Sequence, residues 1–149
     1  MHRNIESTRS IISTCADETT KAAKDLASSL GRGDIVTLEG PLGAGKTTFT
    51  KGLISALTGA DPSCIASPTF TYLNVYDGDI AIHHFDAYRI ESEADFAEMG
   101  LGDFINSEVI SIVEWPGKIP SYTKCSTVCV KIAYLEQDTR EITITYSGL

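Results

Sequence analysis

The residues best suited to chemistry lie in one glycine-rich stretch in the first third of the chain. Residues 40–47 read GPLGAGKT and fit the pattern G-x-x-x-x-G-K-[ST], which arises by chance in about half a per cent of chains of this length. Glycines allow successive backbone N–H groups to point at phosphate oxygens, and the N-terminus of a following helix adds partial positive charge. Lys46 would reach the β- and γ-phosphates, and the hydroxyl of Thr47 would bind Mg²⁺. The stretch therefore predicts a nucleotide site.

Two carboxylates are candidates for the second anchor that Mg²⁺ needs. Asp86 follows the apolar run at 80–85, and Glu114 follows the run at 109–113. If both runs are strands parallel to the one before the glycine-rich stretch, their carboxyl ends open beside it. Both acids would then reach the bound phosphates. The alternative is that they only end their strands.

Several neighbours of these acids have two open interpretations. His83 and His84 face opposite sides of their strand, and we expect packing and hydrogen bonding from them rather than catalysis. Trp115, the only tryptophan, is either a core or surface anchor or a wall of the nucleotide pocket. Ser67 and Thr69 lie in a polar turn that could sense a γ-phosphate or could be an ordinary turn.

The elements that must position these residues alternate between strand and helix in the first part of the chain. Hairpin signals come later, at Asp77-Gly78-Asp79 and at Gln137-Asp138. Ser92 is expected to cap a short helix, and Gly59 to end the helix after the glycine-rich stretch. Strands are expected at 8–14, 34–39, 69–76, 80–85, 109–113, 127–135 and 141–146, and helices at 17–30, 46–57 and 93–99.

This order of elements predicts an α/β fold of the P-loop NTPase type. We expect three layers, with a mainly parallel central sheet to which antiparallel strands are added. The length of 149 residues fits a single P-loop ATPase domain over 1–149, and the 42% hydrophobic content can fill its core without disulfides. Cys15, Cys64, Cys125 and Cys129 have neither disulfide nor zinc-site spacing, so reduced thiols are expected.

The charge balance limits the partners. Asp and Glu number 20 against 12 Lys and Arg, a net charge of −8, which opposes direct binding to DNA, to tRNA or to an anionic membrane. No run of 18 apolar residues occurs. We therefore expect a cytoplasmic protein that contacts tRNA only indirectly, if it serves an RNA process.

The identity of the nucleotide and its use follow from what surrounds the motif. N-K-x-D and D-x-x-G motifs are absent, so ATP is expected rather than GTP. Only Arg89 and Arg140 follow the glycine-rich stretch, and Arg140 lies in the terminal hairpin. An arginine-poor site favours hydrolysis used as a switch over a small-molecule kinase, which is the main alternative. A nucleotide-gated binding module without significant turnover is the third class.

Four motifs in order resemble those of the TsaE (YjeE) family. They are Gly-x-Leu-Gly-Ala-Gly-Lys-Thr-Thr at 40–48, Ser-Pro-Thr-Phe at 67–70, His-Phe-Asp-x-Tyr-Arg at 84–89 and Val-Glu-Trp-Pro at 113–116. The family consists of bacterial P-loop ATPases needed for threonylcarbamoyladenosine (t6A) modification of tRNA. The resemblance implies an Mg-dependent ATPase that binds the TsaD–TsaB threonylcarbamoyltransferase pair and supports its turnover on adenosine 37 of ANN-decoding tRNAs.

The resemblance also implies roles for single residues. Thr47 and Glu114 would bind Mg²⁺, and Asp86 would be the Walker-B-like acid, close enough to contribute to the metal site and to act on the attacking water. Trp115 would lie at the nucleotide, Ser67 and Thr69 would form a switch-like turn, and Thr19 would border the adenine. The phosphate-binding residues implied are Gly43, Ala44, Gly45, Lys46, Thr47 and Thr48.

One position departs from the family. The residue after the first loop glycine is usually aspartate, and here it is Pro41. No role of that carboxylate in catalysis or partner contact can be transferred to this chain. Proline also removes one backbone N–H from the loop, although the donors expected from Gly43 onward remain.

Overall fold

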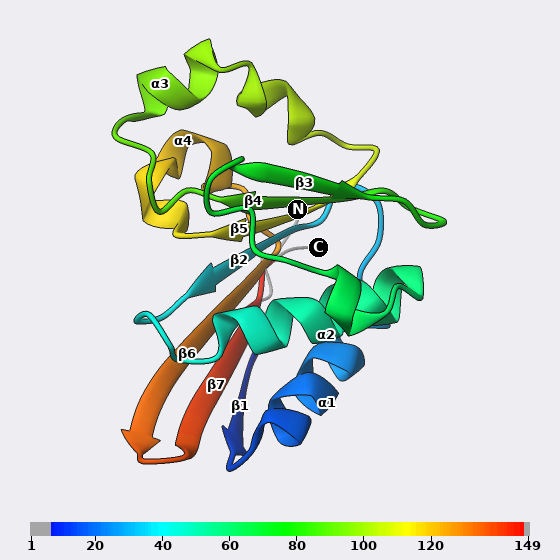
Figure 1. Ribbon diagram of the computed structural model, residues 1–149, viewed down its shortest axis with the longest axis vertical. Helices are drawn as coiled ribbons and strands as arrows, with labels where there is room; N and C mark the ends of the chain where they lie inside the picture. Colours follow the sequence, from blue (N-terminus) through cyan, green and yellow to red (C-terminus); the bar gives the residue numbers. More distant parts are fainter. Residues whose placement is uncertain (1–6, 148–149) are drawn as a thin grey trace, which may run out of the picture.

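A seven-stranded sheet with helices on both faces organises the chain (Figure 1). The structure is a computed structural model that describes residues 7–147. The strands are β1 (Ser7–Ser13), β2 (Ile35–Glu39), β3 (Leu73–Tyr76), β4 (Ile82–Asp86), β5 (Ile110–Glu114), β6 (Val128–Glu136) and β7 (Thr139–Tyr146). The α-helices are α1 (Ala16–Ala27), α2 (Lys46–Thr58), α3 (Glu93–Glu98) and α4 (Pro120–Thr123), with short 3₁₀ turns at Pro62–Cys64, Leu101–Phe104 and Pro116–Lys118.

The middle of the sheet is parallel and its edges are antiparallel. The strand order is β1-β7-β6-β2-β5-β4-β3, and β6, β2, β5 and β4 run in the same direction. β3 pairs antiparallel with β4 at one edge. At the other edge β7 pairs antiparallel with both β6 and β1. This arrangement confirms the predicted mixed α/β fold. It also places the carboxyl ends of β2, β4 and β5 at one edge of the molecule.

Two apolar cores lie on opposite faces of the parallel strands. On one face, α1 and α2 pack over side chains such as Val36, Leu38 and Ile112. On the other face, Phe96 of α3 packs with Phe85 and Val113. Alternating strand residues thus contribute to different cores, as the two-residue side-chain period of a strand requires. The result is three layers over β4 and β5.

The β6–β7 part of the sheet is covered on one face only. Val128, Val130 and Ile132 are buried, whereas Lys131 and Ala133, on either side of Ile132, are exposed. β6 continues past the end of β2. The last β2–β6 pair is Glu39 with Lys131, whereas β6 runs on to Glu136. The rest of the hairpin therefore extends beyond the end of β2, alongside the segment that follows it.

Most predicted elements are confirmed, with boundary shifts that have local causes. The predicted strand at 69–76 begins only at Leu73, because the N–H of Tyr72 bonds to the carbonyl of Pro68 and Tyr72 has a φ of 66°. The first helix ends at Ala27 rather than at Leu30, and shorter-range bonds from Ser29 and Leu30 close its last turn. The predicted caps at Ser92 and Gly59 are both present.

Two further features bear on earlier expectations. The four cysteines, all within the described residues, are free, and three of them are exposed rather than packed. In the part of the chain that the structure describes, no helix is long and apolar enough to span a bilayer.

Candidate functional site

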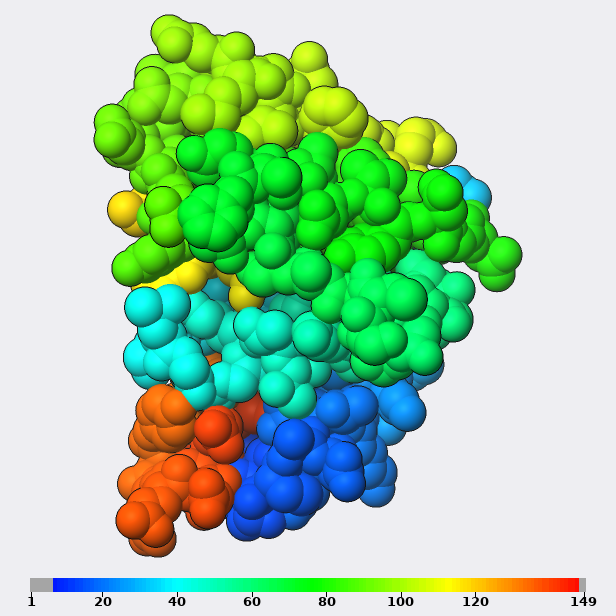
Figure 2. All heavy atoms as spheres, viewed as in Figure 1, coloured from blue at the N-terminus to red at the C-terminus, as the bar shows by residue number. Residues whose placement is uncertain are grey.

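A cavity of about 430 Å³ opens at the carboxyl ends of the parallel strands, next to the glycine-rich loop. In Figure 2 this loop, in cyan, lies between the green segment that contains β3 and β4 and the orange and red β6–β7 hairpin. The cavity is lined by Ala16, Thr19, Leu42, Gly43, Gly45, Lys46, Thr47, Thr48, Ser67, Thr69, Asp86, Tyr88, Glu114, Trp115 and Arg140. These residues come from six separate stretches of the chain.

The loop takes a path that only glycine permits at two points. Gly40 has a φ of 156°, and a Cβ there would lie 2.5 Å from the carbonyl oxygen of Ile132 in β6. Gly45 has a φ of 105° and precedes α2 without any side-chain cap. The first turn of α2 therefore presents backbone N–H groups that no side chain of its N-cap residue satisfies. Such a helix start favours an anion.

Lys46 is the buried cation of the cavity. Its side chain is 6% exposed, and its Nζ has no hydrogen-bond partner among the described residues. The Nζ lies 3.6 Å from the ring centroid of Trp115. Burial lowers the pKa of Lys46 from its usual 10.5, and the nearby carboxylates of Glu114 and Asp86 oppose that shift. A buried ammonium without a hydrogen-bond acceptor is suited to a ligand that supplies anionic oxygens.

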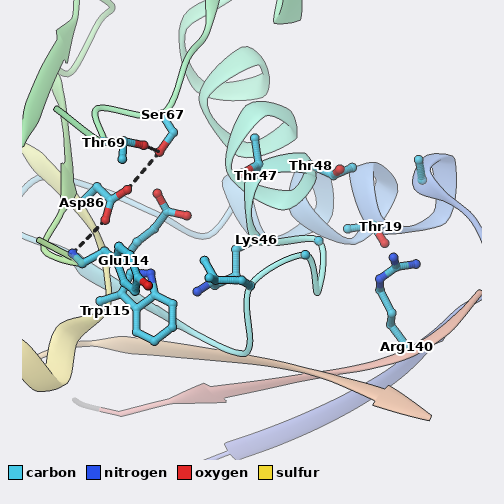
Figure 3. A pocket seen from close by; sticks show the side chains of 15 residues that line it. Thr19, Lys46, Thr47, Thr48, Ser67, Thr69, Asp86, Glu114, Trp115 and Arg140 are labelled. Atoms are coloured by element: carbon cyan, nitrogen blue, oxygen red, sulfur yellow. Dashed lines mark hydrogen bonds between the residues drawn. The ribbon is translucent and has the colours of Figure 1, made fainter. Parts of the chain in front are cut away.

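The two acids lie side by side at the end of the sheet. Asp86 of β4 and Glu114 of β5 are paired in the strand register and are 6% and 4% exposed. The Oδ2 of Asp86 accepts a 3.1 Å bond from the Ser67 hydroxyl, and its Oδ1 accepts a 2.9 Å bond from the N–H of Tyr88. Figure 3 shows both carboxylates on the side of the cavity toward which Lys46 points. We call the part of the cavity that contains Asp86, Glu114, Lys46 and Thr47 the acidic end.

His83 and His84 are both buried and hydrogen-bonded, as the expectation of packing and hydrogen bonding predicted. His84 is 2% exposed, and its Nε2 lies 3.0 Å from the Oε2 of Glu114, to which it donates. His83 faces the opposite side and donates from Nδ1 to the carbonyl of Phe104 at 2.6 Å. His84 therefore holds one oxygen of Glu114 in place and leaves the other for a ligand.

The switch-like turn is connected to Asp86. Thr69 donates from its hydroxyl to the Oγ of Ser67 at 3.4 Å, and Ser67 donates in turn to Asp86. Both residues line the cavity. A movement of this turn would therefore change the hydrogen bond between Ser67 and the carboxylate of Asp86.

Trp115 forms one wall of the cavity. Its φ of 58° lies in the left-handed region, which is strained for a bulky residue, and its ring packs on Tyr88 at 4.9 Å between centroids. Trp115 also borders a second cavity of about 450 Å³, whose other lining residues are Glu39, Gly40, Pro41, Pro116, Gly117 and Lys118. The structure thus places Trp115 at the cavity wall, where it also packs against the core that contains Phe85 and Val113.

The far end of the cavity contains a residue that sequence reasoning missed. Arg140 of β7 points toward Thr19 in Figure 3, away from Asp86 and Trp115. With Ala16 and Thr48 these residues form what we call the arginine end. Arg140 is the one arginine of the described residues that lines the cavity, because Arg89 stacks on Phe70 and does not reach it. A single arginine is in keeping with the expected arginine-poor site. The turn signal at Gln137-Asp138 places Arg140 just after a hairpin turn. It does not show that β6 continues past β2 and so brings this turn to the cavity.

Two residues of the glycine-rich loop, Ala44 and Pro41, do not line this cavity. Ala44 is fully buried in the core that α1 and α2 cover, and its N–H bonds to the carbonyl of Pro41 at 3.1 Å. It does not line the cavity, and its expected contact with a phosphate stays a prediction. Pro41 itself is exposed.

The donor set of the acidic end fits Mg²⁺. The hydroxyl of Thr47 and the carboxylates of Asp86 and Glu114 all line the cavity and supply hard oxygen ligands. Within residues 7–147 no group of three or more His, Cys, Asp or Glu side chains is arranged for a metal ion. A fully protein-coordinated metal is thus not indicated, whereas Mg²⁺ commonly completes its shell with water and substrate phosphates.

Fold and cavity together define a class of protein. It comprises mixed α/β proteins in which a G-x-x-x-x-G-K-[ST] loop joins a strand to a helix at the carboxyl edge of parallel strands, beside two acids. The family described as "Threonylcarbamoyl adenosine biosynthesis protein TsaE" matches residues 13–142. The chain therefore belongs to the TsaE family.

Individual relatives agree with this assignment. A protein of Bacillus subtilis named "tRNA threonylcarbamoyladenosine biosynthesis protein TsaE" is 38% identical over 137 residues, covering 91% of this chain and 84% of the relative. Proteins of the same name from Treponema pallidum and Aquifex aeolicus are 35% and 33% identical, cover 89% and 94% of this chain, and are themselves covered over 97% and 98% of their length. The crystal structure of Bacillus subtilis YdiB is similar with a TM-score of 0.71 and 32% identity, over 99% of this chain and 90% of that one.

Proposed function

We propose that this chain binds ATP with Mg²⁺ in the cavity and hydrolyses it slowly in support of t6A modification of tRNA. The observation that carries the proposal is the buried, unpartnered ammonium of Lys46, placed at an uncapped helix start beside Asp86 and Glu114. These groups are what a triphosphate with a divalent cation needs. The family membership supplies the cellular process.

The residues divide the work by position. Lys46 and the backbone at the start of α2 hold the phosphates, and Thr47 and Glu114 are the protein ligands for the metal. When bound, Mg²⁺ neutralises charge that develops on the phosphate oxygens. Asp86, whose carboxylate Ser67 and the Tyr88 N–H hold in place, is positioned to orient an attacking water and accept its proton.

The partner in this proposal is the TsaD–TsaB threonylcarbamoyltransferase pair, which would carry out the transfer chemistry. A chain of net charge −8 is poorly suited to bind tRNA by itself. It can still hold a triphosphate, because Lys46, backbone N–H groups and Mg²⁺ supply local positive charge inside the cavity. Protein partners therefore provide the contact with tRNA.

The kinase alternative is disfavoured by the acidic end. Small-molecule kinases usually place arginines over the transferred phosphate, and no arginine of the described residues lines that end of the cavity. Arg140 is the cavity's arginine, and it lies at the opposite end.

One set of measurements tests the proposed function. ADP production is followed for the isolated chain with Mg·ATP, then with the TsaD–TsaB pair and tRNA, and separately with a panel of metabolites. We expect slow turnover alone and faster turnover with the pair. Acceptor-dependent ADP production with metabolites would establish a kinase instead, and tight ATP binding with no turnover under any condition would indicate a nucleotide-gated binding module. The same chain, added to extract with ATP or ADP, should recover the TsaD–TsaB pair in at least one state.

A further inference from the structure

The second cavity, of about 450 Å³, shares a wall with the cavity proposed for the nucleotide, which we call the first cavity. Both are lined by Trp115, and the glycine-rich loop enters the second at Gly40 and Pro41. The rest of the lining is Glu39, at the end of β2, and the turn Pro116–Lys118. Its volume lies in the range of small-molecule sites. The proposed function makes no use of this space.

The lining of the second cavity is mainly apolar and has few rotatable bonds. Pro41, Trp115 and Pro116 supply ring surfaces, and the two prolines have a fixed φ. Gly117 leaves open space, because a Cβ built on it would meet no atom within 4 Å. Such walls lose little conformational freedom when they are covered, so they are suited to a flat apolar ligand.

Two charged side chains border the second cavity, and only one of them is paired. Glu39 pairs with Lys131 at 3.8 Å. Lys118 is exposed and takes part in no ion pair within residues 7–147. The uncompensated charge at the cavity is therefore positive, and an anionic group on the ligand would complement it.

The shared wall depends on a contact from the first cavity. The φ of 58° at Trp115 is unfavourable for a bulky residue, so surrounding contacts must maintain it. One of them is the ammonium of Lys46, 3.6 Å from the ring centroid, and another is the ring of Tyr88. Figure 3 shows Lys46 beside the Trp115 ring. A phosphate that binds Lys46 would draw the ammonium away, and the wall would lose one of its supports.

We propose that the second cavity binds a small aromatic carboxylate, and that this ligand opposes nucleotide binding in the first cavity through Trp115. The carboxylate pairs with the ammonium of Lys118, and the aromatic ring packs against Trp115 and the two prolines. The ligand fits the wall as it stands with Lys46 on the ring, so it favours the state without nucleotide. Because coupling is reciprocal, each ligand lowers the affinity for the other by the same factor. Only the coupling rests on the proposed function.

An aromatic carboxylate and its uncharged analogue test the site. Naphthoate and neutral naphthamide are titrated without nucleotide, and the backbone amide shifts of the isotope-labelled chain are followed by NMR. We expect saturable shifts at Gly40, Gly117 and Lys118. Naphthamide should bind about threefold more weakly, since a solvent-exposed ion pair contributes little. Lys118→Ala should reduce the affinity for naphthoate to that for naphthamide.

Two further variants separate the cavity from the rest of the surface. The φ of Gly117 is not positive and its Cβ position is open, so Gly117→Leu should fold, occupy the cavity wall and abolish naphthoate binding. Lys124→Ala removes an exposed lysine outside both cavities and is the matched control for Lys118→Ala. Thermal unfolding checks each variant, and Lys118→Ala carries the test if Gly117→Leu unfolds.

The coupling is measured with both ligands present. Saturating Mg·ADP should weaken naphthoate binding about fivefold, and saturating naphthoate should weaken ADP binding by the same factor. Gly117→Leu should bind ADP as wild type does, and its ADP affinity should not respond to naphthoate.

Three outcomes would overturn the proposal. Absence of saturable shifts at Gly40, Gly117 and Lys118 would remove the site, and equal naphthoate affinity with and without ADP would remove the coupling. An effect of naphthoate on ADP binding that persists in Gly117→Leu would mean that naphthoate binds in the first cavity. Failure of the proposed function looks different, because wild type would then bind naphthoate but not ADP.

Discussion

The two ends of the cavity are built on different principles. At the acidic end, Lys46, Asp86 and Glu114 are each 6% exposed or less, and both acids are fixed by hydrogen bonds from neighbouring groups. At the arginine end, Thr19 belongs to α1 and Arg140 to the terminal hairpin, and the Nε of Arg140 has no hydrogen-bond partner within residues 7–147. The first end is pre-organised for charge, which catalysis of phosphoryl transfer requires. The second end offers shape and one planar cation, which suffices for holding a ligand.

The largest expected effect is at Lys46. Lys46→Ala removes the buried cation of the proposed phosphate site, and we expect ADP and pyrophosphate affinity to fall by about a hundredfold or more. Calorimetry on the folded variant measures this. Lys51→Ala, one helical turn further along α2 and outside the cavity, is the control. If Lys46→Ala bound ADP as tightly as wild type, the assignment of the acidic end would be wrong.

The next effect separates catalysis from binding at the same end. Asp86→Asn keeps the shape of the side chain but removes its charge, so it should lower the ATP hydrolysis rate by about a hundredfold. ADP affinity measured without metal should change little, since Asp86 lies beside the phosphates rather than holding them. A steady-state assay and a binding titration are needed together. Normal hydrolysis by Asp86→Asn would show that the proton acceptor lies elsewhere.

A smaller effect is expected from the support of Glu114. His84→Phe removes the hydrogen bond to Oε2, and loss of such outer contacts typically costs about tenfold or more in metal affinity. The Mg²⁺ concentration that gives half-maximal ATPase activity should rise accordingly. His83→Phe, on the opposite face of β4, is the matched control and should leave that concentration unchanged. Equal effects from both variants would point to general destabilisation.

The smallest effect is a difference in pH dependence. The pKa of Lys46 is lowered in the folded chain, so in the alkaline range below 10.5 the unfolded state binds more protons than the folded state. The contribution of Lys46 to folding stability therefore rises with pH in that range. Lys46→Met lacks this contribution, so its unfolding free energy minus that of wild type should fall as pH rises from neutral toward 10.5. Denaturant titrations at several pH values measure it; a difference that is flat with pH would contradict it.

Sequence reasoning reached the acidic end because its geometry follows from local patterns. The loop motif places Lys46 at a helix start, and Asp86 and Glu114 each follow an apolar strand. Parallel strands bring their carboxyl ends to one edge, so these groups meet without any further information. In the strand order β5 lies between β2 and β4, so the ends of all three strands are neighbours.

The arginine end could not be derived in the same way. Arg140 reaches the cavity because β6 pairs with β2 and then continues past its end, which is a fact of strand register rather than of any motif. The same holds for Tyr134, whose bond to Gly43 joins segments far apart in the chain. The turn at Tyr72 was also missed, because the β-branched and aromatic residues at 69–76 favour a strand, whereas the N–H of Tyr72 bonds to the carbonyl of Pro68.

The position of Trp115 between two cavities has a practical consequence. It is the only tryptophan of the chain, so intrinsic tryptophan emission of the whole protein originates from this single wall. Its indole touches the ammonium of Lys46 on the nucleotide side and borders Pro41 and Pro116 on the other. A molecule that entered either cavity would change the surroundings of the same fluorophore. The chain thus contains an optical probe that needs no label, and competition between phosphate ligands and surface partners could be followed in one cuvette.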